Sequence, residues 1–189
     1  MGLRDVLFGR SKLKEASTEP LFAISTACVT LDVQLGLKPG GAAAVVFKPL
    51  SAGEFVRAEN ELQELLDIVA QESESKLRRK SDTFGYEWLV VEDDQVEDLV
   101  NTVHLIGGEL KSRGFGPQLL AAVFRFNGPG HPVYFVYGYK RGAFWPFVPT
   151  GNGQERDNAE ELELKAKLGA ELPFEEDISR WFGLFDLPL

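Results

Sequence analysis

Apolar and polar residues alternate along VTLDVQL, residues 29–35, which is the pattern of a strand with one buried face. A tight connection at KPGG follows, and AAAVVFKPL, residues 42–50, is apolar on both faces like a more fully buried strand. Together these segments predict a β-hairpin. A helix in place of the first strand stays open, because the stretch from Thr30 to Leu35 contains no helix-breaking residue.

The clearest helix covers residues 52–72, where apolar residues recur at helical spacing among acidic ones. Its predicted apolar stripe consists of Phe55, Leu62, Leu65, Leu66 and Val69. The charged stretch that follows, ESESKLRRKSD, predicts a solvated connector. Its four cations could hold an anion, although a solvated loop is the simpler interpretation; they are Lys76, Arg78, Arg79 and Lys80.

YEWLVVED, residues 86–93, predicts a strand, and a second helix follows directly. Asp94 is expected to cap this helix with Glu97 completing a capping box, and Gly114 is expected to end it. Gly107 and Gly108 lie inside the helix, where glycine lowers helix stability, so we expect a neighbouring backbone to pack closely there. The predicted buried stripe is Val96, Leu99, Val100, Val103 and Leu110.

Three further strands are expected after this helix. QLLAAVFRF (118–126) and VYFVYGY (133–139) are joined by NGPG, a strong hairpin signal. AFWPFVP then contains Pro146 and Pro149, which lack the N–H that an inner strand donates, so this stretch belongs at a sheet edge.

The last part of the chain predicts a third, acid-rich helix over residues 154–169 and an aromatic tail, ISRWFGLFDLPL. The helix has only a narrow apolar stripe, Ala159, Leu162 and Ala166. The tail is expected either to cap the core or to cover a partner.

These elements predict an α+β domain, with a mainly antiparallel sheet of about five or six strands and helices packed mostly on one face. A chain of 189 residues, 44% of them apolar, suits one such domain. We expect a short basic amphipathic segment over residues 1–16 and a single globular domain, with the aromatic tail, over residues 17–189.

Charge separates the N-terminal segment from the rest of the chain. Of 20 bases and 29 acids, residues 1–14 hold four bases and one acid, which leaves 16 bases and 28 acids elsewhere. The net charge of −9 argues against general nucleic-acid binding. The segment is interpreted either as a terminal helix docked on its own domain or as an amphipathic contact with an anionic membrane surface. The candidate membrane-contact residues are Leu3, Arg4, Val6, Leu7, Phe8 and Arg10.

Neither a metal-binding nor a nucleophilic motif is present in the sequence. Cys28 is the only cysteine, and His104 and His131 lack the spacing of metal ligands. The glycine clusters lack the spacing of a phosphate loop, and there is no G-x-S-x-G motif. We therefore expect no catalytic residue, metal or cofactor. With no run of eighteen apolar residues and no signal-peptide pattern, the sequence predicts a cytoplasmic protein.

GYKRGAFWPFVPT, residues 138–150, is the strongest candidate for a binding surface, because two cations lie among four aromatic residues. Aromatic anchors beside a cation suit a docked partner, whereas prolines and charges also serve to protect a sheet edge, and both interpretations stay open. A helix cap with a surface ion pair is the simpler interpretation of the nearby Arg156 and Asp157. The candidate residues are Tyr139, Lys140, Arg141, Phe144, Trp145, Phe147, Arg156 and Asp157.

Several motifs, spread in order over nearly the whole chain, resemble the PspA-associated protein PspAB family. They are MGLRDVLFGRSK, GFGPQLLAAVFRF, YKRGAFWPFVP, ERDNAEELEL and DISRWF. The resemblance implies an accessory protein of the cell-envelope stress response, with a phage-shock-protein-A-like membrane-stress protein as its partner and no known catalytic residues. The alternative is a small-ligand sensor, in which Arg141 or Arg156 pairs with an anionic ligand in a pocket walled by the aromatic residues.

Overall fold

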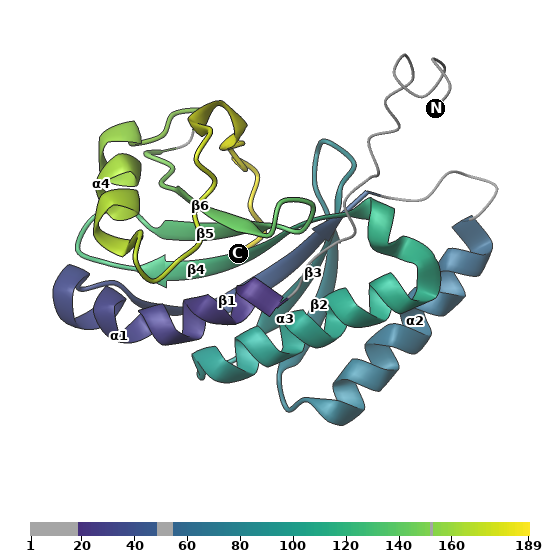
Figure 1. Cartoon of the computed structure of the whole chain (residues 1–189). Coiled ribbons are helices and arrows are strands. Elements are labelled where there is room, and N and C mark those ends of the chain that lie inside the picture. Colours follow the sequence, from purple (N-terminus) through teal and green to yellow (C-terminus); the bar gives the residue numbers. More distant parts are fainter. Residues whose placement is uncertain (1–18, 49–54, 152) are drawn as a thin grey trace, which may run out of the picture.

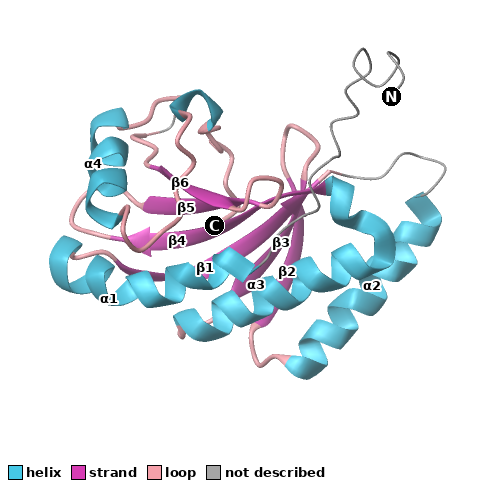
Figure 2. Ribbon diagram, viewed as in Figure 1, coloured by secondary structure: helices cyan, strands magenta, loops and turns pink. Residues whose placement is uncertain are grey.

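One antiparallel sheet of six strands organises the molecule, in the order β2-β3-β1-β4-β5-β6 (Figures 1 and 2). The structure, a computed structural model, describes residues 19–48, 55–151 and 153–189. The strands are β1 (Lys38–Phe47), β2 (Lys76–Ser81), β3 (Glu87–Glu92), β4 (Leu119–Asn127), β5 (Val133–Gly138) and β6 (Ala143–Phe147). This architecture confirms the predicted α+β class, and β2 and β6 are the two edges of the sheet.

The helices pack mainly on one face of this sheet, where α1 and α3 lie across the strands and α2 flanks α3 (Figure 1). Helix α4 lies beside the edge strand β6. The helices are α1 (Ala23–Leu35), α2 (Phe55–Glu72), α3 (Val96–Leu110) and α4 (Asn158–Leu168). Short 3-10 turns occupy Glu19–Phe22, Gly116–Gln118 and Ile178–Arg180, and a π-helical turn occupies Lys111–Phe115. No helix among the described residues is long and apolar enough to cross a membrane.

The period-two alternation of the strands gives the sheet two apolar faces. In β1, Ala43 and Val45 face the helices, whereas Ala44 and Val46 face the opposite side. That opposite side is covered by the end of the chain, which buries Trp181 and packs further side chains against the strands: Leu184, Phe185, Leu187 and Leu189. The aromatic tail therefore caps the core. We call residues 173–189 the C-terminal strap.

The predicted strand at residues 29–35 is wrong, since these residues form the second half of α1. Ile24, Ala27 and Leu31 are buried at helical spacing, and Gly36 ends the helix in the left-handed conformation at φ 64°. Two outward positions of α1, Val29 and Val33, are apolar as well, which obscures the helical period. KPGG is the start of β1 rather than a hairpin turn.

The predicted solvated connector is also wrong, because its cations form the edge strand β2, paired with β3. Arg78 forms an ion pair with Glu92, and Arg79 Nε lies 2.8 Å from a Glu87 carboxylate oxygen. Cross-strand ion pairs keep the charges at the surface while the backbone pairs with β3. A charged strand of this kind also protects a sheet edge from pairing with another chain.

Helix α3 has the predicted buried stripe but not the predicted cap. Gln95 precedes the helix and makes no side-chain capping bond, and its N–H donates to Asp93 at 2.9 Å. Asp94 therefore does not cap α3. Gly114, with φ at 90°, lies at the end of the helical run as predicted.

Gly107 of α3 packs against a side chain, Tyr139, and not against a backbone as expected. A Cβ at Gly107 would lie 2.9 Å from the Tyr139 hydroxyl oxygen and 3.3 Å from two ring carbons, whereas a Cβ at Gly108 would meet no atom within 4 Å. Gly107→Ala should lower the free energy of unfolding by about 1–3 kcal/mol through overpacking. Gly108→Ala should raise it by up to about 1 kcal/mol, since alanine favours helix. Equal effects of the two alanines in urea denaturation would contradict this packing.

Helix α4 buries a different stripe from the predicted one. Leu164 and Leu168 face the core together with the carboxylate of Glu161, while Ala159, Leu162 and Ala166 are exposed. The helix is rotated in this way because a charged residue is taken into the interior. The predicted N-terminal segment, with all its membrane-contact candidates, lies outside the described residues.

Candidate interaction site

The four aromatic candidates of the 138–150 stretch are buried and are divided between the two faces of the sheet. Tyr139 and Phe144 belong to the core on the helix side. Trp145 and Phe147 belong to the core beneath the C-terminal strap. These four buried side chains support the β5–β6 turn from within, and we call them the buried frame. They are not exposed anchors for a partner.

Ring and hydrogen-bond contacts fix this frame from both sides. Phe144 lies 4.9 Å from the ring of Tyr137, and Phe147 makes an edge contact with Phe185 at 5.1 Å. Trp145 Nε1 donates to the carbonyl of Phe182 at 3.1 Å. Tyr139 has a pKa raised far above its ordinary value by burial, and among the described residues its hydroxyl has no hydrogen-bond partner.

The outer edge of β6 is occupied by the chain itself. Phe144 N–H donates to Pro173 at 2.7 Å, and the Phe144 carbonyl accepts from Glu175 N–H at 2.8 Å. The C-terminal strap thus begins as a short parallel bridge to β6. β6 lies at the predicted edge, but at Phe144 this edge has no free backbone groups for an added strand.

Beyond Phe144, residues of helix α4 and its N-cap occupy the backbone groups of the same edge. Val148 N–H donates to Glu161 Oε1 at 2.8 Å, and the Val148 carbonyl accepts from Asp157 N–H at 2.8 Å. Pro146, which lies between Phe144 and Val148, has no N–H, and its carbonyl accepts a hydrogen bond from Arg156 at 3.4 Å. Partner binding by strand addition at β6 would require these contacts to break.

Arg156 and Asp157 hold α4 against this edge. Asp157 caps α4 by accepting from Glu160 N–H at 2.9 Å, as the simpler interpretation predicted. The ion pair is not at the surface, however: Arg156 Nε lies 2.9 Å from both carboxylate oxygens of Glu161, which is 1% exposed. The guanidinium also lies 5.0 Å from the centroid of the Phe147 ring.

The same guanidinium reaches the C-terminal strap, since Arg156 Nη1 donates to the Trp181 carbonyl at 2.8 Å. The Arg156 guanidinium therefore contacts β6, helix α4 and the C-terminal strap at the same time. Glu161 and Trp181 belong to this cluster as well, although no sequence motif indicates them. The spacing of Glu161, five residues after Arg156, was a weak signal in so acidic a helix.

Cationic side chains remain exposed at the tip of the frame. Lys140 is exposed, and Arg141 pairs with Glu175 at 3.2 Å while keeping 42% of its side chain accessible. Arg180 approaches the same Glu175 at 3.9 Å, and Ile178 on the same turn is exposed. We call Lys140, Arg141, Ile178 and Arg180 the basic patch.

The charges of this patch are held in place by their neighbours. A hydrogen bond from Ser179 holds the pKa of Asp177 below its usual value, and the charges of Arg180 and Arg141 act in the same direction. Arg180 Nε lies 2.8 Å from an Asp177 carboxylate oxygen. Arg141 and Arg180 are thus brought together around two carboxylates, although they lie far apart in sequence.

A pocket of about 380 Å³ lies elsewhere, between the end of α2 and helix α3. Its lining contains neither Arg141 nor Arg156 and is mainly acidic and hydroxylic: Glu72, Ser73, Glu74, Ser75, Asp98, Asn101, Thr102 and Leu105. The hydroxyls bond one another, with Ser75 Oγ also donating to Asp93 at 2.8 Å. No group of three or more possible metal ligands occurs among the described residues.

The thiol of the single cysteine is not activated as a nucleophile. Cys28 Sγ donates to the Ile24 carbonyl at 3.2 Å. Burial, with a smaller contribution from the charge of Glu97, raises the pKa of Cys28 to about 12. The thiol is therefore protonated at neutral pH and is a poor nucleophile.

The fold and the site together define a single-domain α+β protein with a closed sheet edge and an exposed basic patch. The chain belongs to the PspAB family, described as PspA associated protein B, whose family model matches residues 1–189, the whole length of the chain. No curated protein and no solved structure matches it.

Proposed function

We propose that this chain is a non-catalytic accessory protein that binds a phage-shock-protein-A-like partner in the cell-envelope stress response. The family description supports a role linked to PspA. The observation that carries the choice of surface is the basic patch, in which Lys140, Arg141 and Arg180 are presented at the surface by a buried frame.

The side chains of the basic patch are held in place before any partner binds. Buried aromatic residues hold the β5–β6 turn, and Glu175 holds both arginines, so little side-chain freedom is lost when a partner binds. Ile178, which is exposed on the same turn as Arg180, supplies an apolar contact beside the cations. The three cations of the patch exceed by one charge the two carboxylates that hold the arginines, Glu175 and Asp177, so the patch favours an acidic surface on the partner.

The proposed contact lies beside the strand β6 and not on its backbone. Because β6 is closed by Pro173, Glu175 and helix α4, the partner would meet side chains of the patch and not the β6 backbone. Contact between residues 1–14 and an anionic membrane surface stays a separate prediction from the sequence.

Neutralising the patch should weaken partner binding. For Lys140→Gln/Arg141→Gln/Arg180→Gln we expect about a tenfold rise in Kd for the purified phage-shock-protein-A-like protein, as about 0.5 kcal/mol per lost rim charge would give. Calorimetric titration at two salt concentrations measures it, and the wild-type complex should weaken at the higher salt. Glutamine is used because a glutamate at position 141 would repel Glu175 and loosen the strap.

The matched control removes three cations elsewhere on the surface, in Lys38→Gln/Lys76→Gln/Lys167→Gln. Both triple variants have the same net charge and should have similar melting temperatures. Equal Kd values for the two variants would remove the basic patch from the interface. Failure of the wild-type chain to bind the partner would overturn the proposed function itself.

A further inference from the structure

Helix α1 lies at the surface but carries few of the charged residues that are typical of surface helices. Its thirteen residues include a single charged side chain, Asp32. Val29 is 70% exposed and Val33 is 79% exposed, and Phe22, just before the helix, is 39% exposed. These positions, with exposed Thr26, follow the four-three-four spacing of one helix face.

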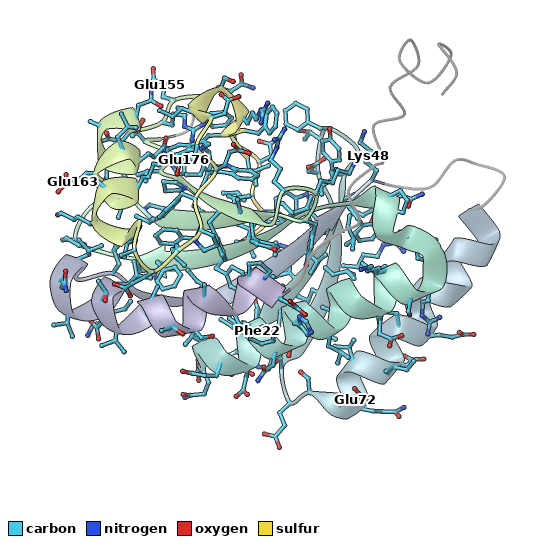
Figure 3. All side chains as sticks on the ribbon, viewed as in Figure 1. Phe22, Lys48, Glu72, Glu155, Glu163 and Glu176 are labelled. Atoms are coloured by element: carbon cyan, nitrogen blue, oxygen red, sulfur yellow. The ribbon has the colours of Figure 1, made fainter. Side chains whose placement is uncertain are left out.

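Among the described residues, the contact made by this face is between Phe22 and His104. The centroids of these two rings lie 4.7 Å apart. Figure 3 shows Phe22 between the start of α1 and α3. Ile24, Ala27 and Leu31 bury one side of α1 in the core, whereas Val29 and Val33 point outward beside polar residues that are uncharged except for Asp32. Its outer face therefore has the composition of an interface.

The surroundings of this face are acidic. Residues 19–37 contain Glu19 and Asp32 and no lysine or arginine, and neither base occurs in α3. Glu97 of α3 acts on α1 closely enough that its charge raises the pKa of Cys28. A segment that covers α1 would be favoured if it were apolar on one side and basic around it.

We propose that the outer face of α1 is the docking site for residues 1–14 of the same chain. That segment holds four bases and one acid, and its sequence places Leu3, Val6 and Leu7 on one face of a short helix. Only residues 15–18 separate it from the first described residue, Glu19, and short connections join antiparallel helices. Fourteen helical residues would extend about 20 Å, the length of α1.

The size and charge of the face favour this occupant over a second copy. Two exposed valines and part of one phenylalanine are far less than the roughly 800 Å² per partner that a stable dimer buries. Two copies of a chain with net charge −9 would also repel each other, whereas residues 1–14 are opposite in charge to the rest.

The site goes beyond partner binding at the basic patch and does not depend on it. It bears on the membrane, because one apolar face of residues 1–14 cannot cover α1 and enter a lipid surface at the same time. Docking on α1 and binding to anionic vesicles should therefore compete.

Hydrogen exchange of the full-length chain tests the docking. Amides of residues 4–13 in the wild type should exchange about tenfold more slowly than in Val29→Gln/Val33→Gln, which removes the apolar contact while keeping good helix formers. The control is Leu162→Gln, which replaces an apolar residue that is 46% exposed on α4. It should keep the wild-type protection, and all three proteins should melt at similar temperatures.

Four outcomes would overturn the proposal. One is exchange of residues 4–13 in the wild type at the rate of an unstructured peptide. Another is equal protection of these residues in the double glutamine variant. Protection that rises with protein concentration would assign the face to a second copy. Protection that appears only with phosphatidylserine vesicles, independently of Val29 and Val33, would assign residues 1–14 to the membrane. Stronger vesicle binding by the double glutamine variant than by the wild type is the result expected from competition.

Discussion

Glu161→Ala is expected to lower the free energy of unfolding by about 3–5 kcal/mol, the usual cost of leaving one member of a buried ion pair without its partner. The substitution leaves the Arg156 guanidinium without the carboxylate that it contacts at 2.8–2.9 Å. It also removes the acceptor of the Val148 N–H. Urea denaturation monitored by tryptophan fluorescence measures the loss.

Helix α4 provides a matched control two residues away. Glu163→Ala removes an exposed carboxylate that pairs with Lys167 at 2.6 Å, and surface pairs of this kind contribute about 0–1 kcal/mol. Glu161→Gln should fall between the two alanine variants, because the amide oxygen can still accept from Val148. If Glu161→Ala and Glu163→Ala were equally mild, the contacts of Arg156 would not hold α4 to the sheet.

The sequence predicted the sheet best where strands are apolar and bounded by clear turns. β3, β4 and β5 follow their patterns, and Pro146 correctly indicated the edge position of β6. Alternation, turn residues and proline can each be read from a few neighbouring residues. By contrast β2, whose residues are mostly charged, is a strand because it pairs with β3, and its own composition gives no indication of that pairing.

The residues of α1 that imitate a strand are those of the proposed docking face. Val29 and Val33 alternate with polar residues and so imitate a half-buried strand, but both are on the outer face of a helix. A surface helix with apolar residues on both sides has no clear helical period. The misleading pattern arises from the residues that we propose to be covered by another segment.

The sequence placed the aromatic candidates beside two cations but did not indicate that their side chains are buried. In a strand, Phe144 must face the opposite way from Trp145 and Phe147, so alternation alone excluded one contiguous aromatic surface. The burial of Glu161 and the meeting of Arg141 with Arg180 depend on long-range packing, which no local pattern contains.

The C-terminal strap spans the sheet from one edge to the other. It begins at β6, where Glu175 pairs with Phe144, and its far end reaches the β2 side, where Lys80 Nζ donates to the Pro188 carbonyl at 3.3 Å. Thr83 and Asp186 are hydrogen-bonded in the same region. Residues with little regular secondary structure thus complete a core that the helices leave half covered.

Trp181→Ala should therefore be among the most damaging substitutions, with a loss of about 3–5 kcal/mol in the free energy of unfolding. The indole is buried, and its Nε1 donates to the Glu175 carbonyl at 2.9 Å. Removing it leaves a cavity over the sheet beside the carbonyl that Arg156 contacts. Phe182→Ala, one residue further along and 63% exposed, should change stability by no more than about 0.5 kcal/mol.

Dye binding separates a loosened strap from general unfolding. In Trp181→Ala, below the melting transition, an apolar dye such as ANS should bind the face formed by Val46, Trp88 and Val136, and far-ultraviolet circular dichroism should be retained. Equal stability of Trp181→Ala and Phe182→Ala would mean that the strap contributes little to the fold. The apolar face beneath it would then be open to a partner, and the contact would have to be sought there instead of at the basic patch.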